Sequence, residues 1–261
     1  MIHQPTTLKM ELYKLFKKKT TYLLCINYLV PIIFGIGMFA QVSFLVSDGT
    51  DSFDIISTQG ISGLEFINNM MTQAHYITVF ILVVISSLAF SGEVECKQID
   101  LYVVRICNRG KIILAKFLAL TFLQVLYYMI FSIISLVIYI FFVNQSKYGN
   151  GMIYDSNHMQ YILSFLIRFL GVMSITALNI FIGMKTKSFP CFAATYIIWF
   201  ITKYINFFDN IKLFIPDNFA EYILSNKAND FQIVLYAGLF LIYTILSLII
   251  SIISFTKKDL K

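Results

Sequence analysis

The residues best suited to hydrolytic chemistry in this sequence are a serine between glycines and a histidine downstream of it. Residues 60–63 read GISG, and His75 follows in the same connection between apolar runs. A serine within reach of a histidine forms the nucleophile and base of many hydrolases, so an intramembrane serine protease is one hypothesis. However, Ser62 falls in an acidic connection that we expect outside the membrane, and so short a motif is common by chance. We therefore expect no catalytic residue.

The other residues with ligand or cofactor chemistry form no recognisable site. A membrane metalloprotease needs histidines and paired carboxylates within its spans, whereas His3, His75 and His158 all fall outside the span interiors. The cysteines show neither metal-ligand spacing nor a disulfide framework; they are Cys25, Cys96, Cys107 and Cys191. A phosphate-binding loop G-x-x-x-x-G-K-[ST] is missing, since GMKTKS from Gly183 does not fit it. The sequence predicts no metal site, no cofactor held by this chain and no ATP hydrolysis by that route.

Composition places these residues in a membrane protein. The chain has 261 residues, of which 58% are hydrophobic and 13% are charged, against about 45–50% and about 25% in soluble domains. The net charge of +6 lies in the connections between apolar runs, not on one soluble face, so it does not indicate a nucleic-acid partner. We expect a single all-α transmembrane domain over residues 1–261.

Six apolar runs are candidates for membrane-spanning helices. A span needs about 20 mostly apolar residues, and helix is the expected state because a backbone in lipid must satisfy its own hydrogen bonds. The predicted spans are residues 22–46, 76–92, 112–143, 159–184, 189–208 and 233–255.

The basic residues predict how the spans are oriented. Fifteen Lys and Arg residues fall in the N-terminal segment, the second and fourth connections and the C-terminal tail, while Lys147, Lys212 and Lys227 fall on the opposite side. Cytoplasmic connections carry the excess of Lys and Arg. Both termini and residues 93–111 are therefore expected in the cytoplasm and residues 47–73 outside.

The N-terminal segment 1–21 predicts a short helix lying in the cytoplasmic interface. Its apolar residues recur at helical spacing, with lysines mostly on the other face; the apolar residues are Leu8, Leu12, Leu15 and Phe16. The alternative is a generic basic anchor that only sets topology.

The connection 93–111 carries a second amphipathic pattern. Charged residues bracket an apolar stretch in which Ile99, Val103 and Ile106 share one helical face. A short helix of this kind suits docking into a groove of a cytosolic partner. The alternative is an ordinary interfacial loop.

This connection resembles the intracellular connection of ABC-2 type permeases, the membrane subunits of ABC exporters. Gly92, Glu93 and Glu95 match the start of the family pattern, residues 101–104 match its hydrophobic stretch, and Arg109 with Lys116 match its end. The sequence departs from the pattern at residues 97–98, where Gly-Thr is usual, and at 106, where Pro is usual. The layout of basic interfacial helix, six spans and basic tail is similar as well.

The resemblance implies a function and partners. In such permeases the second–third connection is a coupling helix seated on a separate ATPase subunit, which binds ATP and Mg²⁺. The implied coupling residues are Glu93, Val94, Glu95, Ile99, Val103, Ile106, Arg109 and Lys116. Two ATPase subunits and a second permease, identical or related, would complete an exporter of a hydrophobic or amphipathic peptide, antibiotic or lipid in a bacterial cell membrane. The competing hypothesis is a non-transporting membrane scaffold or sensor.

The last connection, residues 209–232, is expected outside, with short re-entrant helices dipping toward the outer leaflet. Asn218 and Glu221 have the spacing of a capping box, which would start such a helix. The alternative is a soluble outer loop with some apolar residues.

Polar residues within the spans are the remaining candidates. Arg168 lies in the outer half of the fourth span, where it either snorkels to the headgroups or faces a substrate path or permease interface. Lys203, near the outer end of the fifth span, is expected to snorkel. Asn179 shares the substrate-path hypothesis with Arg168. For Asn179, as for Asn27 and Gln124, hydrogen bonding between helices is the simpler explanation.

Overall fold

The computed structural model describes residues 7–40, 60–96, 109–204, 213–225 and 227–257, and within these the fold is all-α. The described residues form no strand, only one isolated bridge between Ile61 and Gly149. The segment that holds Ile99, Val103 and Ile106 lies outside the described residues.

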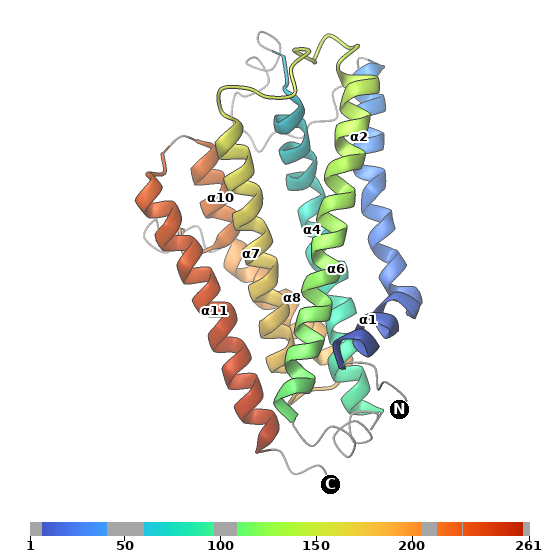
Figure 1. Cartoon of the computed structure of the whole chain (residues 1–261), viewed down its shortest axis with the longest axis vertical. Helices are drawn as coiled ribbons and strands as arrows, with labels where there is room; N and C mark the ends of the chain where they lie inside the picture. Colours follow the sequence, from blue (N-terminus) through green and yellow to red (C-terminus); the bar gives the residue numbers. More distant parts are fainter. Residues whose placement is uncertain (1–6, 41–59, 97–108, 205–212, 226, 258–261) are drawn as a thin grey trace, which may run out of the picture.

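The helices stand roughly side by side as an elongated bundle (Figure 1). The first described helix and the last turns of the last one lie at the lower end of this view, which we call the terminal end; the other is the far end. The elements are α1 Thr7–Lys17, a 3₁₀ segment η1 Lys19–Tyr28, α2 Leu29–Phe39, α4 Gly63–Glu95, α6 Arg109–Ile138, a π-helical turn η2 Tyr139–Val143, α7 His158–Gly183, α8 Ser188–Tyr204, α10 Pro216–Leu224 and α11 Asp230–Thr256.

Within the residues that the structure describes, five helices are long and apolar enough to cross a membrane, which indicates a multi-pass membrane protein. They are Lys19–Phe39, Gly63–Glu95, Gly110–Val143, His158–Gly183 and Asp230–Thr256. The predicted fifth span, 189–208, corresponds to α8. The described part of α8 has 17 residues, or about 25 Å at 1.5 Å per residue.

The second span starts much earlier than its hydropathy predicts. Hydropathy places the start at 76, but α4 starts at Gly63, because Ser62 and Glu65 form a capping box. The expected outer loop is therefore helical from Gly63 onward. Two of the polar residues that lowered the hydropathy, Asn68 and His75, are buried inside the protein.

The same helix separates the two residues of the hydrolase hypothesis. Ser62 caps α4, where its side chain accepts a hydrogen bond from the Glu65 N–H. His75 lies thirteen residues further along the same helix, which is about 20 Å of rise. The two side chains therefore do not form a nucleophile–base pair.

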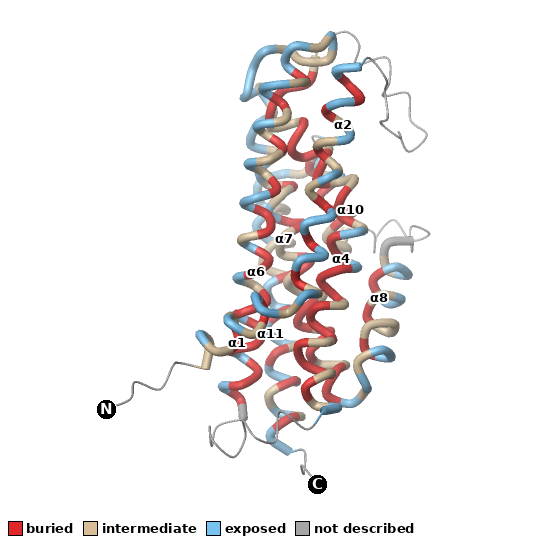
Figure 2. The backbone as a smooth tube through the Cα atoms, turned by 90° about the vertical axis from the view of Figure 1, so that its right-hand side faces the viewer, coloured by how far each residue is buried: buried red, intermediate tan, exposed pale blue. Residues whose placement is uncertain are grey.

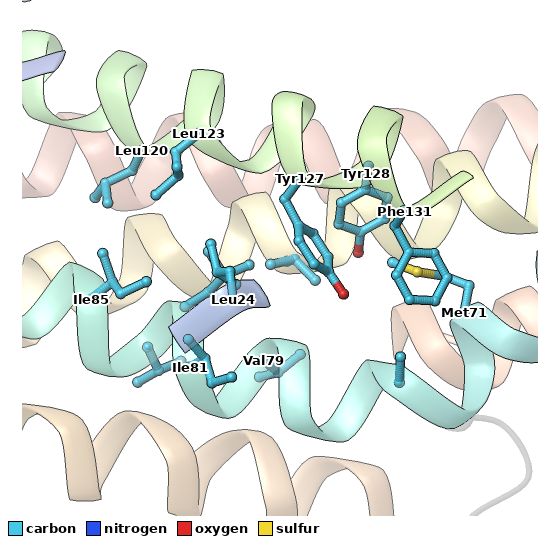
Figure 3. Close-up of a cluster of buried hydrophobic side chains, with 14 of the residues drawn as sticks. Leu24, Met71, Val79, Ile81, Ile85, Leu120, Leu123, Tyr127, Tyr128 and Phe131 are labelled. Carbon is cyan, nitrogen blue, oxygen red and sulfur yellow. The ribbon is translucent and has the colours of Figure 1, made fainter. Parts of the chain in front are cut away.

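The centre of the bundle is α4, which packs against α6, α7 and α8. Figure 2 shows buried residues along much of the bundle interior, whereas α11 has a largely exposed face. Leu24, Ile81, Leu120 and Phe131 belong to the cluster of buried apolar side chains in Figure 3, contributed by η1, α4 and α6.

Polar side chains cross this apolar interior as hydrogen bonds between helices. Asn27 Nδ2 donates to Thr78 Oγ1 over 2.9 Å, and Thr78 Oγ1 lies 2.9 Å from the Tyr127 hydroxyl. Gln124 Nε2 donates to the carbonyl of Phe169 over 3.0 Å. The predicted helix–helix hydrogen bonds of Asn27 and Gln124 are thus confirmed.

The described part of the last connection contains one short helix, α10, that packs along the far half of α7 (Figure 1). Its start at Pro216, with proline in the first turn, differs from the predicted capping box at Asn218 and Glu221, which is wrong. Phe219 and Ile223 are buried in a cluster with Ile167 of α7. Residues 209–212 and 226 lie outside the described part.

Gly171 allows this close approach, and the contact predicts a packing cost. A Cβ at Gly171 would lie 2.6 Å from the Pro216 Cβ, whereas a Cβ at Gly238 would meet nothing within 4 Å. We expect Gly171→Ala to lower the melting temperature, since overpacking costs about 1–3 kcal/mol. Gly238→Ala should keep or raise it, because alanine favours helix by up to about 1 kcal/mol. Thermal unfolding in detergent compares the two; equal stabilisation by both would contradict this packing.

Candidate functional site

At the terminal end, α1 crosses the start of α6 beside the last turns of α4 (Figure 1). Five charged side chains meet there, and we call them the ion cluster: Glu11, Lys14, Lys18, Glu93 and Lys116. They come from α1 and the residue after it, from α4 and from α6. The ion cluster thus joins three elements that are far apart in sequence.

Lys116 is the centre of the ion cluster. Its ammonium donates to Glu93 Oε2 over 2.5 Å, to Glu11 Oε2 over 2.9 Å and to the Ala89 carbonyl over 2.9 Å. An ammonium has three N–H donors, so these three acceptors satisfy it fully. The residue is only 2% exposed. Such a charge is tolerated in an apolar interior because it is paired and hydrogen-bonded.

Two further lysines lie on the more exposed side of the ion cluster. Lys14 Nζ lies 3.3 Å from Glu11 Oε1 and 3.4 Å from Glu93 Oε2, and Lys18 Nζ lies 3.5 Å from Glu93 Oε1. Burial lowers the pKa of the Lys18 ammonium, although the Glu93 carboxylate opposes that change. Three ammonium groups face two carboxylates, so each carboxylate of the ion cluster has at least two cationic partners.

A second set of bonds fixes the neighbouring helix ends. Glu95 Oε2 accepts hydrogen bonds from the Ser188 N–H over 3.3 Å and from its hydroxyl over 3.0 Å, at the start of α8. A carboxylate is favourable there because a helix N-terminus is partly positive. Ser91 Oγ donates to the Thr186 carbonyl over 2.5 Å. The end of α4 is therefore tied to the α7–α8 connection.

The consequence for residues 97–108 is geometric. The helix before this segment ends at Glu95 and the helix after it starts at Arg109. Glu93 and Lys116, which are bonded to each other, lie on those two helices. The ion cluster thus holds both flanks of the predicted coupling segment in fixed positions.

Of the predicted coupling residues, the structure brings together Glu93 and Lys116, and both are buried. Their contacts suit positioning of the segment rather than direct docking. Val94 packs partly buried against the core, Glu95 is exposed beside Ser188, and Arg109 begins α6. The other predicted coupling residues lie outside the described part; they are Ile99, Val103 and Ile106.

Sequence reasoning missed the contribution of α1. Glu11 is an acidic residue within the basic N-terminal segment, and it lies at helical spacing with Leu8, Leu12 and Leu15, on the face predicted to be apolar. An acid on the apolar face of a basic helix signals a buried cationic partner. That partner is Lys116, which is 105 positions away in sequence.

A separate polar group lies between α4, α7 and α10. Arg168 is buried, and its Nη1 donates to Asn68 Oδ1 over 3.0 Å, so the guanidinium does not reach the bundle surface. Nearby, His75 Nε2 lies 2.8 Å from Asp217 Oδ1. The described residues contain no group of three His, Cys, Asp or Glu side chains that could hold a metal ion.

Asn179 connects three helices. Its Nδ2 donates to the Val83 carbonyl over 2.9 Å and to Ser86 Oγ, and its Oδ1 accepts from Thr195 Oγ1 over 2.9 Å. These bonds link α7 to α4 and α8. The predicted role of Asn179 in helix–helix hydrogen bonding is confirmed.

The ion cluster predicts a specific stability effect. Lys116→Met should lower the melting temperature strongly, because unpairing the buried Glu93 and Glu11 costs about 3–5 kcal/mol. Lys9→Met removes a lysine from the exposed side of the same helix as Glu11, and it should change the melting temperature little. Thermal unfolding of both variants in detergent measures the difference. Equal melting temperatures for the two would show that Lys116 is not an essential partner of Glu93 and Glu11.

Comparison with known proteins yields one match. A family model for proteins of unknown function, DUF2705, matches residues 26–261, which is nearly the whole chain and includes all six candidate spans except the start of the first. No curated protein and no solved structure matches the chain. The match includes Glu93 and Lys116 of the ion cluster and begins after α1. The chain therefore belongs to the DUF2705 family, whose function is unknown.

Proposed function

We propose that this chain is the permease subunit of an ATP-driven exporter in a bacterial cell membrane, powered by ATPase subunits on separate chains. In this proposal α8 continues as the fifth of six spans, and the terminal end faces the cytoplasm. The exported molecule is hydrophobic or amphipathic, such as a peptide, an antibiotic or a lipid. A second permease, identical or related, completes the translocation path.

The observation that carries the proposal is the ion cluster beside residues 97–108. A docking segment transmits force only if its flanks are rigid. Glu93 and Lys116 bond to each other over 2.5 Å on the two flanking helices, and Glu11 adds α1 to the same unit. A partner that displaced the segment would therefore move α1, α4 and α6 together.

The length and contacts of α4 determine how far that motion is transmitted. This helix has 33 residues, about 50 Å of rise, and it packs against α6, α7 and α8. A tilt of its terminal end therefore carries to its far half, where Asn68 and His75 contact α7 and α10. Coupling by rigid-body tilting of packed helices is the mechanism that this arrangement favours.

The coupling proposal predicts a position-specific loss of partner binding. Val103→Asp should abolish co-purification of a phosphate-loop ATPase and its stimulation, because a charge in an apolar docking face is costly. Met152→Asp, an exposed position in the far-end connection, is the matched control and should leave both unchanged. Co-purification from membranes with measured melting temperatures separates docking from folding. Full ATPase recovery with Val103→Asp would refute docking at this segment.

The orientation has its own test. With Cys25, Cys96 and Cys107 replaced by serine, a cysteine introduced at Asp51 should react with a membrane-impermeant maleimide in intact cells, and one at Lys258 should not. The excess of Lys and Arg at the terminal end is the reason for this expectation. Labelling of the Lys258 position alone would show that the topology is the reverse of the proposed one.

A further inference from the structure

A cavity of about 350 Å³ lies between α7, α8 and α11, and residues 214–217 bound it toward the far end. Its walls come from one face of each helix; the lining includes Ser174, Leu178, Thr195, Trp199, Tyr243 and Ser247. Both α8 and α11 pack against α7, and neither packs extensively against the other within the described residues. The space between them makes the cavity accessible from the side of the bundle, where lipid would lie.

The hydroxyl groups in this cavity present acceptor atoms. Ser174 Oγ donates to the Leu170 carbonyl or, alternatively, to the Phe240 carbonyl, and Thr202 Oγ1 donates to the Trp199 carbonyl. Thr195 Oγ1 donates within the bundle to Asn179 or Cys191. Thr202 is half-buried and its hydroxyl hydrogen is used inside the protein, so its lone pairs can accept a hydrogen bond from a ligand. Ser174 Oγ also lies 2.9 Å from Thr244 Oγ1, and Thr195 is fully buried.

The charged and aromatic residues of the lining also favour a ligand that donates hydrogen bonds. Asp217 is the one charged residue among the described lining residues, and Trp199, Phe214 and Tyr243 add three aromatic rings. Arg168 attracts the Asp217 carboxylate electrostatically, and His75 Nε2 lies 2.8 Å from Asp217 Oδ1. A carboxylate combined with aromatic faces is the chemistry that recognises ammonium groups.

We propose that this cavity binds an amphipathic molecule with an ammonium head, which contacts Asp217 and the aromatic rings, and an apolar chain, which lies along α7 and leaves between α8 and α11. The cavity volume falls within the range of about 300–1,000 Å³ usual for small-molecule sites. Binding requires neither ATP nor a partner chain, so the site stands independently of the proposed transport function.

Trp199 makes the test direct, because it is the single tryptophan of the chain and it lines the cavity. The protein is reconstituted in nanodiscs of phosphatidylglycerol, and its tryptophan fluorescence is titrated with an alkyltrimethylammonium ion whose chain carries bromine, a contact quencher. Matched probes carry the same brominated chain with a hydroxyl or a sulfonate head. We expect saturable quenching by the ammonium probe at concentrations about tenfold below those that the other two require.

Three variants test whether the quencher binds in this cavity. Asp217→Asn should weaken the ammonium probe about tenfold without affecting the hydroxyl probe, since one charge-assisted contact is lost. Ser247→Phe fills the cavity from α11 and leaves the His75–Asp217 pair intact, so it should abolish saturable quenching. Ile249→Phe, exposed on the same helix and outside the lining, is the control and should behave like the parent.

Two results would overturn the proposal: equal quenching by all three probes, or saturable quenching that survives Ser247→Phe. Both would mean that the probe reaches Trp199 only from bulk lipid. Repeating the titration with phosphatidylethanolamine in the nanodisc identifies the source of the natural ligand. A fall in apparent probe affinity would show that an ammonium-bearing lipid occupies the site, and an unchanged affinity would indicate a free cationic amphiphile.

Discussion

The structure depends most on one buried ammonium group. Lys116 is enclosed by apolar helices, and a lone charge there would be too costly to retain. Glu93, Glu11 and a main-chain carbonyl satisfy it fully, so three elements must meet at that point. The position of α1 and the spacing of α4 and α6 at the terminal end both follow from this requirement.

The same helix that supplies Glu93 carries the contacts at the other end of the bundle. His75 lies eighteen positions before Glu93 on α4, about 27 Å away along the axis, and it contacts Asp217 of α10. Asn179 bonds to α4 between these two levels. The ion cluster and Asp217, which bounds the cavity, therefore both contact one long helix. A movement of α4 at the proposed docking segment would thus reach the proposed ligand site.

Hydropathy located the spans well where lipid-facing residues dominate. The ends of α7 and α11 lie within three residues of the predicted ones, because in both helices apolar residues predominate almost to each end. It failed at the start of α4, where polar side chains such as Asn68 pair inside the bundle. The resemblance to ABC-2 type permeases singled out Glu93 and Lys116 as coupling residues, but no local pattern shows that they bond to each other or that Glu11 joins them. Pairings over such sequence distances depend on tertiary packing.

In the proposed function, the segment 93–111 forms the contact with a separate ATPase. A photo-crosslinking amino acid placed at position 103, with position 152 as the far-end control, tests it in living cells. Mass spectrometry of the adducts should identify a protein with a nucleotide-binding phosphate loop at position 103 and none at position 152. Adducts at position 103 with lipid alone, or with a protein that lacks such a loop, would contradict the account.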